Sequence, residues 1–217
     1  MNALKGEIKK DLKQDTRHCL LQAASKLFAA LGFAKTSTRD LARESNTNVA
    51  LISYHFGSKE GLYKELLREF ALEVKNSSQV LIEKSQNSEM TLELFKKDIE
   101  SIVDSMLHLR RKYPEVCVIL SREKLEGMPQ AKEIHEEIIY PLIQKFYELF
   151  RRAQDKNIVR KDIDPALFFI FLSEGLWGFF ELTSCDVHVR KDVNNYLEDI
   201  PKLKDQILKV FLNGVLV

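Results

Sequence analysis

A few consecutive side chains beginning at Asn48 have the types needed to read the edges of DNA bases. The amide of Asn48 can pair in bidentate fashion with adenine. Val49 and Ala50 can contact a thymine methyl group, and the Ser53 hydroxyl can serve either base. Tyr54 adds a phenolic hydroxyl that suits a phosphate oxygen. Such small side chains would let a helix lie deep in the major groove, unless the segment serves only core packing.

Two short helices are expected to position these side chains. Ser37 and Asp40 have the spacing of a capping box, which starts the first of them. The turn Ser-Asn-Thr-Asn at 45–48 separates it from the second, which Gly57 ends. A helix of about two turns is unstable alone, so packing must hold it. The apolar anchors are Leu41, Ile52 and Phe56, facing Leu27, Phe28 and Leu31. This arrangement predicts a helix-turn-helix.

The rest of the chain also predicts helices and almost no alternating, strand-like segment, so the fold class is all-α. The expected helices cover residues 15–31, 58–85, 91–112, 115–126, 130–155, 165–184 and 201–215. Proline at the first helical position marks three of them, and Pro141 predicts a kink near 137–141. We expect a flexible arm at 1–14, a three-helix DNA-binding domain at 15–60, and a ligand-binding and dimerisation domain at 61–217.

The N-terminal segment resembles the DNA-binding domain of the tetracycline-repressor (TetR) family. The resemblance rests on "AASKLFAALGFAKTS", "TRDLA" and "YHFGSKEGLY", which are collinear over about 50 residues. It implies a homodimer that binds a palindromic DNA operator as a transcriptional regulator, most commonly a repressor, with an activator of the same fold as the alternative. By position, base contacts fall to Asn48, Val49, Ala50 and Ser53, and phosphate contacts to Thr38, Arg39, Tyr54, His55 and Lys59.

Departures from the family pattern limit what the resemblance implies. Val49 stands where a basic residue or proline is frequent, and Ser53 where an aromatic residue is frequent. We still expect the helix that begins after Asn48 to enter the major groove. The base sequence of the operator is not predicted. Asn46 replaces a frequent glycine in the turn, and asparagine tolerates the left-handed conformation. His55 is either a phosphate ligand or a satisfied buried histidine.

Composition indicates a globular protein that stays inside the cell. Of the 217 residues, 45% are hydrophobic and 30% charged, with a net charge of +1. Residues 1–70 hold 12 Lys and Arg against 8 Asp and Glu, whereas the remainder holds 21 against 24. No apolar signal segment and no uninterrupted run of roughly 18 apolar residues is present, so we expect a cytoplasmic protein without a membrane span. Lysines 5, 9, 10 and 13 either reach the DNA backbone or belong to a solvated terminus.

The two final helices are expected to form the dimer interface. The segment 165–184 is apolar on more than one face, which a monomer of this size cannot easily bury. The candidate interface residues are Phe168, Phe171, Leu172, Gly175, Phe179, Ile207, Val210 and Phe211. The alternative is a core within one subunit.

The middle helices are expected to enclose a pocket for a small-molecule effector. Polar groups on apolar segments are costly unless they are paired or face a ligand. The candidate pocket residues are Met106, Cys117, Leu120, Arg122, His135, Ile139, Phe146, Glu174 and Trp177. Glu174 has an ion pair at an interface or solvent edge as its alternative.

Catalysis and metal binding are not expected. The five histidines are scattered, and the sequence has no glycine-rich phosphate loop, nucleophile elbow, HExxH or CxxC motif. The three cysteines lack a pairing pattern and are expected to be buried, small apolar residues. No cofactor is implied. The remaining rival is a helical protein-interaction module without specific DNA binding.

Overall fold

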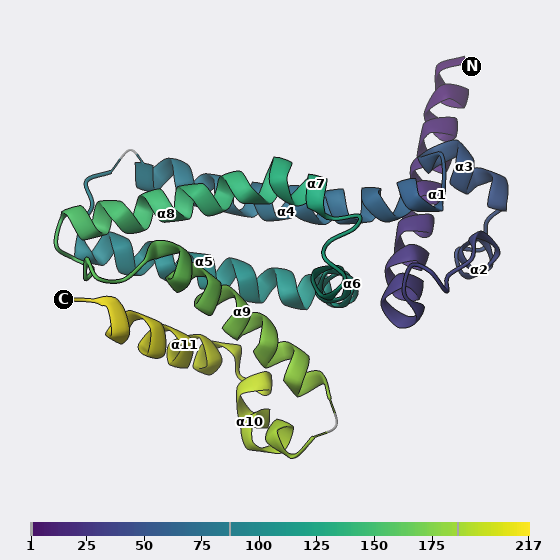
Figure 1. Ribbon diagram of the computed structural model, residues 1–217. Helices are drawn as coiled ribbons and strands as arrows, with labels where there is room; N and C mark the ends of the chain where they lie inside the picture. Colours follow the sequence, from purple (N-terminus) through teal and green to yellow (C-terminus); the bar gives the residue numbers. More distant parts are fainter. Residues whose placement is uncertain (1, 87, 186) are drawn as a thin grey trace. The chain divides into compact units, whose positions relative to one another are not determined.

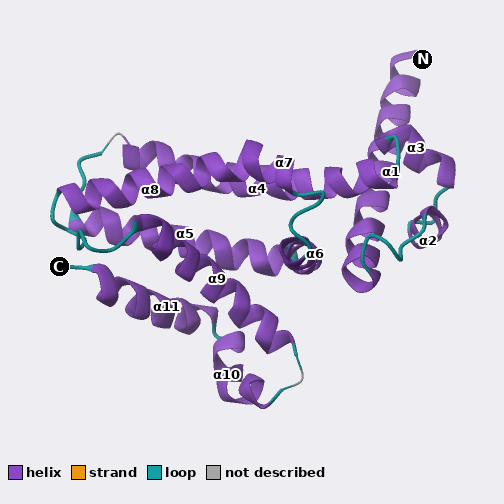
Figure 2. Ribbon diagram, viewed as in Figure 1, coloured by secondary structure: helices purple, strands orange, loops and turns teal. Residues whose placement is uncertain are grey.

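The computed structural model describes the backbone of residues 2–86, 88–185 and 187–217, and the side chains of these ranges from residue 15 onward except 80–86. Figures 1 and 2 show that these ranges are built from helices, and an isolated antiparallel bridge joins Val159 and Leu216. The helices are α1 (Asn2–Leu31), α2 (Thr38–Glu44), α3 (Val49–Phe56), α4 (Lys59–Gln86), α5 (Leu92–Lys112), α6 (Pro114–Leu125), α7 (Lys132–Ile134), the π-helix η1 (His135–Ile139), α8 (Tyr140–Asp155), α9 (Pro165–Ser184), α10 (His188–Glu198) and α11 (Ile200–Val215). The all-α prediction is confirmed.

The chain folds as two compact units. Unit 1 comprises residues 1–73 and 110–138, and unit 2 comprises residues 74–109 and 139–217. In unit 1, residues 61–73 and 110–138 therefore pack with the N-terminal helices. The functional boundary expected at residue 60 stays a prediction, and the lysines of the expected arm lie outside the residues whose side chains are described.

The core of unit 1 explains why α2 and α3 are stable although they are short. Leu41 of α2 and Ile52 of α3 are 0% and 1% exposed, as is expected for their anchoring role. They share the interior of the unit with Phe28 of α1, whereas the expected anchor Leu31 is 46% exposed. The ring of Phe28 meets Tyr63 of α4 edge-on, with centroids 5.0 Å apart. Burial of one apolar face thus holds each short helix.

Local capping fixes the ends of α2 and α3 as the sequence predicts. The Ser37 hydroxyl accepts from the Asp40 N–H, and the Asp40 carboxylate accepts from the Ser37 N–H, which completes the capping box. The turn between the helices places Asn46 at a φ of 51°, in the left-handed region. Gly57, at a φ of 76°, ends α3. The chain therefore turns at Asn46 and Gly57, two residue types that tolerate a positive φ.

Unit 2 has an aromatic core. Phe95 of α5 and Phe150 of α8 are fully buried, and their ring centroids lie 5.9 Å apart. Phe168 of α9 packs on Phe150 at 4.9 Å and meets Phe211 of α11 at 5.9 Å. These contacts join α5, α8, α9 and α11 into one cluster.

The kink expected near Pro141 appears as a change of helix type. Proline cannot donate an N–H to the preceding turn, so the regular hydrogen-bond ladder cannot pass through it. The chain adopts the π-helix η1 at His135–Ile139, and α8 begins at Tyr140 with Pro141 in its first turn. π-helical turns inside helices are a recognised origin of such kinks.

Two expectations need correction. The segment at 188–198, for which no helix is expected between those at 165–184 and 201–215, forms α10, because Val193, Tyr196 and Leu197 recur at helical spacing among charged residues. Of the cysteines only Cys117 is buried, whereas Cys19 and Cys185 are exposed.

Among the described residues, one helix is long and apolar enough to cross a membrane, judged by length and composition alone. This helix is α9. Core helices of globular proteins pass the same test. The buried edge of α9, with Phe168, Leu172 and Leu176, packs into the unit 2 core. Only 22% of the apolar window of α9 is buried, so core packing accounts for part of its apolar character.

Candidate nucleic-acid interface and effector cavity

The helix α3 presents a solvent-facing surface that contains every expected base-contacting residue. Val49 is 39% exposed and Tyr54 is 61% exposed, whereas Ile52 on the opposite side is 1% exposed. The side chains of Asn48, Ala50 and Ser53 are also exposed. The packing thus turns the small and polar side chains outward, which is the orientation that a groove-reading helix needs.

Asn48 has a structural duty that limits how it can read a base. It is the N-cap of α3, and its Oδ1 accepts a hydrogen bond of 2.9 Å from the N–H of Ala50. A bidentate contact to adenine needs this oxygen as an acceptor for the N6 amino group. The cap occupies one of the two lone pairs of Oδ1, so the expected bidentate contact has to use the other lone pair together with the Nδ2 amide.

The expected phosphate contacts differ in how they are placed. Arg39 and Tyr54 are exposed, and Thr38 is half-buried at the start of α2. His55 is half-buried and lies between Tyr54 and Phe56, with ring centroids 5.0 and 6.0 Å away. Its surroundings fit the buried-histidine alternative as well as a contact at the edge of the interface.

Lys59 is held inside the domain. Its Nζ donates to the carbonyl oxygens of Phe33 and Thr36, both at 2.9 Å, and lies 4.2 Å from the centre of the Phe33 ring. An ammonium group has three N–H donors, so these two bonds leave one. Lys59 therefore fixes the loop between α1 and α2, and its expected phosphate contact, which would use the remaining donor, stays a prediction.

Charged side chains of α1 and α4 stabilise the C-terminal end of α3. The guanidinium of Arg17 lies 5.6 Å from the centre of the Phe56 ring. The same group donates to Glu69 at 2.6 Å and to Glu65, both on α4. Arg17 thereby ties α1 and α4 to the end of α3, which limits how α3 can tilt.

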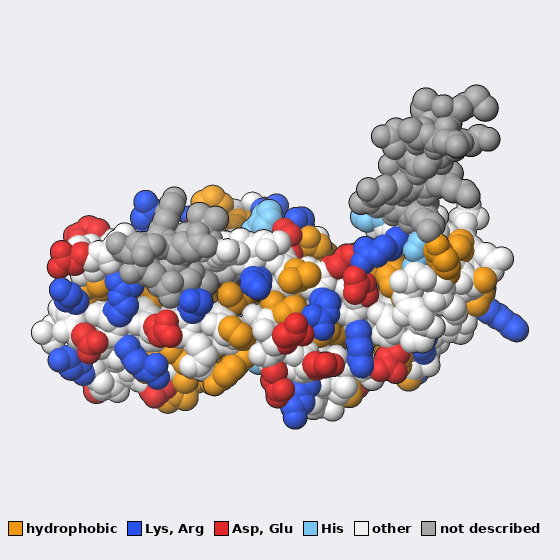
Figure 3. All heavy atoms as spheres, turned by 90° about the horizontal axis from the view of Figure 1, so that it is seen from above, with side chains coloured by type: hydrophobic (Ala, Val, Ile, Leu, Met, Phe, Trp, Pro, Cys, Tyr) orange, Lys and Arg blue, Asp and Glu red, His pale blue; other side chains and the backbone are white. Residues whose placement is uncertain are grey.

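Charge on the molecule is mixed. On the face shown in Figure 3, Lys and Arg side chains are interspersed with Asp and Glu, in line with a net charge of +1. Affinity for a polyanion therefore has to come from local contacts around α2 and α3 rather than from the overall charge.

Comparison with known proteins agrees with this geometry. Residues 20–66, which contain α2, α3 and the adjoining parts of α1 and α4, match the family model "Bacterial regulatory proteins, tetR family". The chain carries a tetR-family DNA-binding domain. Among named relatives it is similar to the probable HTH-type transcriptional regulator YttP of Bacillus subtilis, with 41% identity over 59 residues, 27% of this chain and 28% of that protein.

A second relative extends the similarity beyond the tetR-family domain. The HTH-type transcriptional repressor KstR2 of Rhodococcus jostii is 27% identical over 170 residues, 76% of this chain and 78% of that protein. The solved structure of the ketosteroid transcriptional regulator KstR2 of Mycobacterium tuberculosis has a TM-score of 0.70 at 19% identity, and the match covers 93% of this chain and 95% of that chain. Both of these relatives are named as transcriptional regulators, and the solved structure shares its fold with nearly the whole of this chain.

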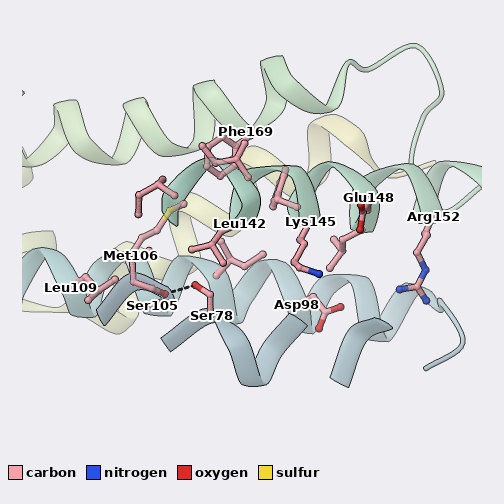
Figure 4. A pocket seen from close by; sticks show the side chains of 16 residues that line it. Ser78, Asp98, Ser105, Met106, Leu109, Leu142, Lys145, Glu148, Arg152 and Phe169 are labelled. Atoms are coloured by element: carbon pink, nitrogen blue, oxygen red, sulfur yellow. Dashed lines mark hydrogen bonds between the residues drawn. The ribbon is translucent and has the colours of Figure 1, made fainter. Parts of the chain in front are cut away.

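Unit 2 contains a cavity of about 160 Å³. Helices α4, α5 and α8 form its walls, and Phe169 of α9 contributes a ring (Figure 4). The apolar part of the lining includes Ile102, Met106, Leu109, Leu142, Phe146 and Phe169. The polar part consists of Ser78, Asp98, Ser105, Lys145, Glu148 and Arg152. A mainly apolar concave space with a few polar groups is typical of a small-molecule site.

Three of the nine expected pocket residues line this cavity, namely Met106, Ile139 and Phe146. The expectation was wrong for Cys117, Leu120, Arg122 and His135, which belong to unit 1. In unit 1, Arg122 donates to the carbonyl oxygen of Phe28 at 2.9 Å. His135 is partly buried there, and this burial lowers its pKa. Glu174 and Trp177 lie on α9 but do not line the cavity.

The expected dimer residues divide between the interior and the surface. Phe168 and Leu172 are 5% and 0% exposed within unit 2, so they cannot contact a partner, and this part of the expectation was wrong. Phe171 is 65% exposed and Val210 is 70% exposed. Gly175 is exposed, whereas Phe179, Ile207 and Phe211 are partly buried. The same face of α9 also exposes the unpredicted Leu167, Ile170 and Leu182.

Several cavity residues were missed from the sequence. On α8, Leu142, Lys145, Leu149 and Arg152 recur at intervals of three and four residues. On α5, Asp98, Ile102, Ser105 and Leu109 do the same. Residues at this spacing share one helix face. In each helix such a face contains both apolar and charged residues, and this pattern could have predicted the cavity lining.

Proposed function

We propose that this chain is a repressor that binds a palindromic operator as a homodimer and releases it when a small molecule enters unit 2. The observation that carries the DNA-binding role is the exposure of Val49 and Tyr54 on α3, a helix that is otherwise anchored by a buried Ile52. The match of residues 20–66 to the tetR-family model supports the same role.

Dimerisation follows from how little one helix can read. A single recognition helix contacts too few base pairs for selectivity, so tetR-family regulators act as dimers on DNA operators. In this chain the exposed apolar face of α9 and α11, with Phe171 and Val210, is the surface proposed to join two subunits. Burial of large exposed apolar residues is the main driving force for such association.

The effector response needs only a difference in affinity between two conformations. Recognition helices of a dimer occupy successive major grooves about 34–36 Å apart, so a displacement of a few ångströms removes one half-site. A hundredfold preference of the effector for the released state corresponds to about 2.7 kcal/mol of coupling. The name of the M. tuberculosis neighbour refers to ketosteroids, and the mainly apolar cavity in unit 2 supports an apolar effector here too. The proposed location is the cytoplasm, where DNA and such metabolites meet.

Mobility-shift titration on DNA from the region upstream of the protein's own gene tests this proposal. A regulator gives a saturable shift that weakens as salt rises, because lysine and arginine release counterions from DNA when they bind. Random DNA of the same length serves as the control. Equal affinity for both DNAs, or no shift at low salt, would reject operator binding.

A further inference from the structure

Arg17 of α1 contacts two other helices of unit 1, α3 and α4 (Figure 1). Its Nη1 donates to Glu69 at 2.6 Å, and its Nη2 donates to Glu65, one turn earlier on α4. Its Cζ lies 5.6 Å from the centre of the ring of Phe56, the last residue of α3. One side chain therefore joins the end of the candidate recognition helix to both α1 and α4.

The two carboxylates explain why an arginine suits this position. Glu65 and Glu69 are four residues apart on α4, so their charges would repel each other without a cation between them. The planar guanidinium presents its N–H donors in a fixed fork, and both carboxylates accept from it. A single exposed ion pair contributes little, but two charge-assisted bonds from one rigid group fix where that group lies. The guanidinium is thereby held within cation–π range of Phe56.

The orientation of α3 depends on few contacts. Within α3, whose side chains are all described, Ile52 is the one buried residue. Asn48 lies four residues before Ile52, about 6 Å along the helix axis, so a tilt of about 10° around Ile52 moves it by about 1 Å. Hydrogen bonds form over a range of about 0.5 Å in donor–acceptor distance, so such a tilt would break a contact to a base edge. Phe56 lies four residues after Ile52, where a second fixed contact opposes the tilt.

We propose that Arg17 is a positioning residue for base recognition, which fixes the tilt of α3 through Phe56 and touches no base itself. The inference rests on the proposed function in taking α3 as the helix that reads the operator. A phosphate contact adds affinity for every DNA sequence, whereas a fixed tilt adds affinity for the operator alone. The ratio of operator affinity to random-DNA affinity therefore distinguishes the two roles.

Arg17→Met removes the charge and the donors of this side chain. In fluorescence-anisotropy titrations at one salt concentration, its ratio of operator affinity to random-DNA affinity should fall about tenfold, which corresponds to the loss of roughly one base contact. Arg68→Met is the matched control, because it removes from α4 an arginine that pairs with Glu137 at 3.0 Å. The control should keep the wild-type ratio. An unchanged ratio in Arg17→Met, or the same fall in Arg68→Met, would overturn the proposal.

Neutralising the two carboxylates gives a test of opposite sign. Loss of negative charge by itself raises the affinity of a protein for DNA of any sequence. In the double variant Glu65→Gln, Glu69→Gln, however, Arg17 keeps only neutral acceptors, whose hydrogen bonds are about half as strong. The ratio of operator to random-DNA affinity should therefore fall about threefold. The double variant Glu60→Gln, Glu73→Gln removes two other carboxylates of α4, both paired with lysines, and should keep the ratio. Equal ratios in the two double variants would contradict the proposal.

Hydrogen exchange of the full-length protein without DNA separates this inference from the proposed function. Arg17→Met should speed exchange of the backbone N–H groups at residues 53–57 by about tenfold, because the end of α3 opens more often. Arg68→Met should leave these rates unchanged, and unaltered helical circular dichroism shows that both variants fold. Unchanged rates in Arg17→Met would sink the inference even if the operator is bound. Equal binding of operator and random DNA by the wild type would count against the proposed function alone, since exchange reports on α3 without DNA.

Discussion

The guanidinium of Arg122 on α6 donates a hydrogen bond of 2.9 Å to the carbonyl oxygen of Phe28, in the last turn of α1. The same oxygen accepts the N–H of Gly32 at 2.9 Å. Carbonyl groups at the end of a helix lack partners within the helix and carry partial negative charge, so a cation there is stabilising. The hydrogen bond from Arg122 therefore links α6 to α1, the first helix of the DNA-binding domain.

Removal of the hydrogen bond between Arg122 and Phe28 should destabilise unit 1. Arg122→Met should lower the free energy of unfolding by about 1–3 kcal/mol, because a hydrogen bond to a charged group is lost at a helix end. Urea denaturation followed by circular dichroism measures the change. Arg111→Met, an exposed arginine of the same unit, is the control, and equal losses in the two variants would show that the contact with Phe28 contributes nothing.

Tyr63 should set an alkaline limit to stability. Its hydroxyl donates to Glu123 at 2.8 Å, and burial together with this bond raises its pKa. The folded state therefore holds the proton more tightly than the unfolded chain, so the stabilisation is complete below about pH 10 and is lost as the pH rises above it. Tyr63→Phe should show a flatter decline in urea midpoint above about pH 10. Tyr140→Phe, at a 49% exposed tyrosine, should follow the wild type, and parallel profiles for all three proteins would refute the assignment.

The cap formed by Asn48 can be separated from base recognition by substitution. Asn48→Ala loses both, and should cost about 1 kcal/mol of stability. Asn48→Ser keeps an acceptor for the Ala50 N–H and loses only the amide donors. The serine variant should therefore retain stability and relax base preference at one position in each half-site, measured by fluorescence anisotropy on a panel of single-base operator variants. If the serine variant reads every base as the wild type does, Asn48 serves only as a cap.

Tyr54 should contribute affinity without sequence preference. Its exposed hydroxyl suits a phosphate oxygen, so Tyr54→Phe should weaken binding to operator and random DNA by a similar factor, about fivefold for one lost hydrogen bond. Titration of both DNAs at the same salt concentration measures this. A change confined to the operator would instead place the residue against a base.

The exposed face of α9 should carry the dimer. Phe171→Glu puts a charge into the proposed contact, where burial without a partner is unfavourable, and should convert the dimer to a monomer in analytical ultracentrifugation. Leu125→Glu is the control because Leu125 is 88% exposed in unit 1. A dimer that persists in Phe171→Glu would move the interface elsewhere.

The parts of the fold that depend on local chemistry could be predicted from the sequence. Ser37, Asp40 and Gly57 determine where α2 and α3 begin and end through bonds to nearby backbone groups, and a single sequence displays those signals. Burial of Leu41 and Ile52 followed from their spacing. The segment around α10 was harder because its apolar residues are few and partly exposed.

The parts that depend on how helices rotate against one another could not be predicted. An all-round apolar helix has no polar face to indicate its orientation, so Phe168 and Phe171 look equivalent in the sequence although one is 5% and the other 65% exposed. The cavity depends on where α4, α5 and α8 meet, and no local pattern reports that meeting. Arg122 was misassigned for the same reason, because its partner lies 94 residues away.

Chemical interference on the operator tests most directly whether α3 enters the major groove of duplex DNA as one of a symmetric pair. Methylation of guanine N7 modifies the major groove, whereas methylation of adenine N3 modifies the minor groove. A pair of recognition helices predicts strong interference by N7 methylation in two symmetric clusters about 34–36 Å apart along the duplex, and weak interference by N3 methylation within those clusters. Interference from the minor groove alone, or a single cluster without a symmetric mate, would contradict it.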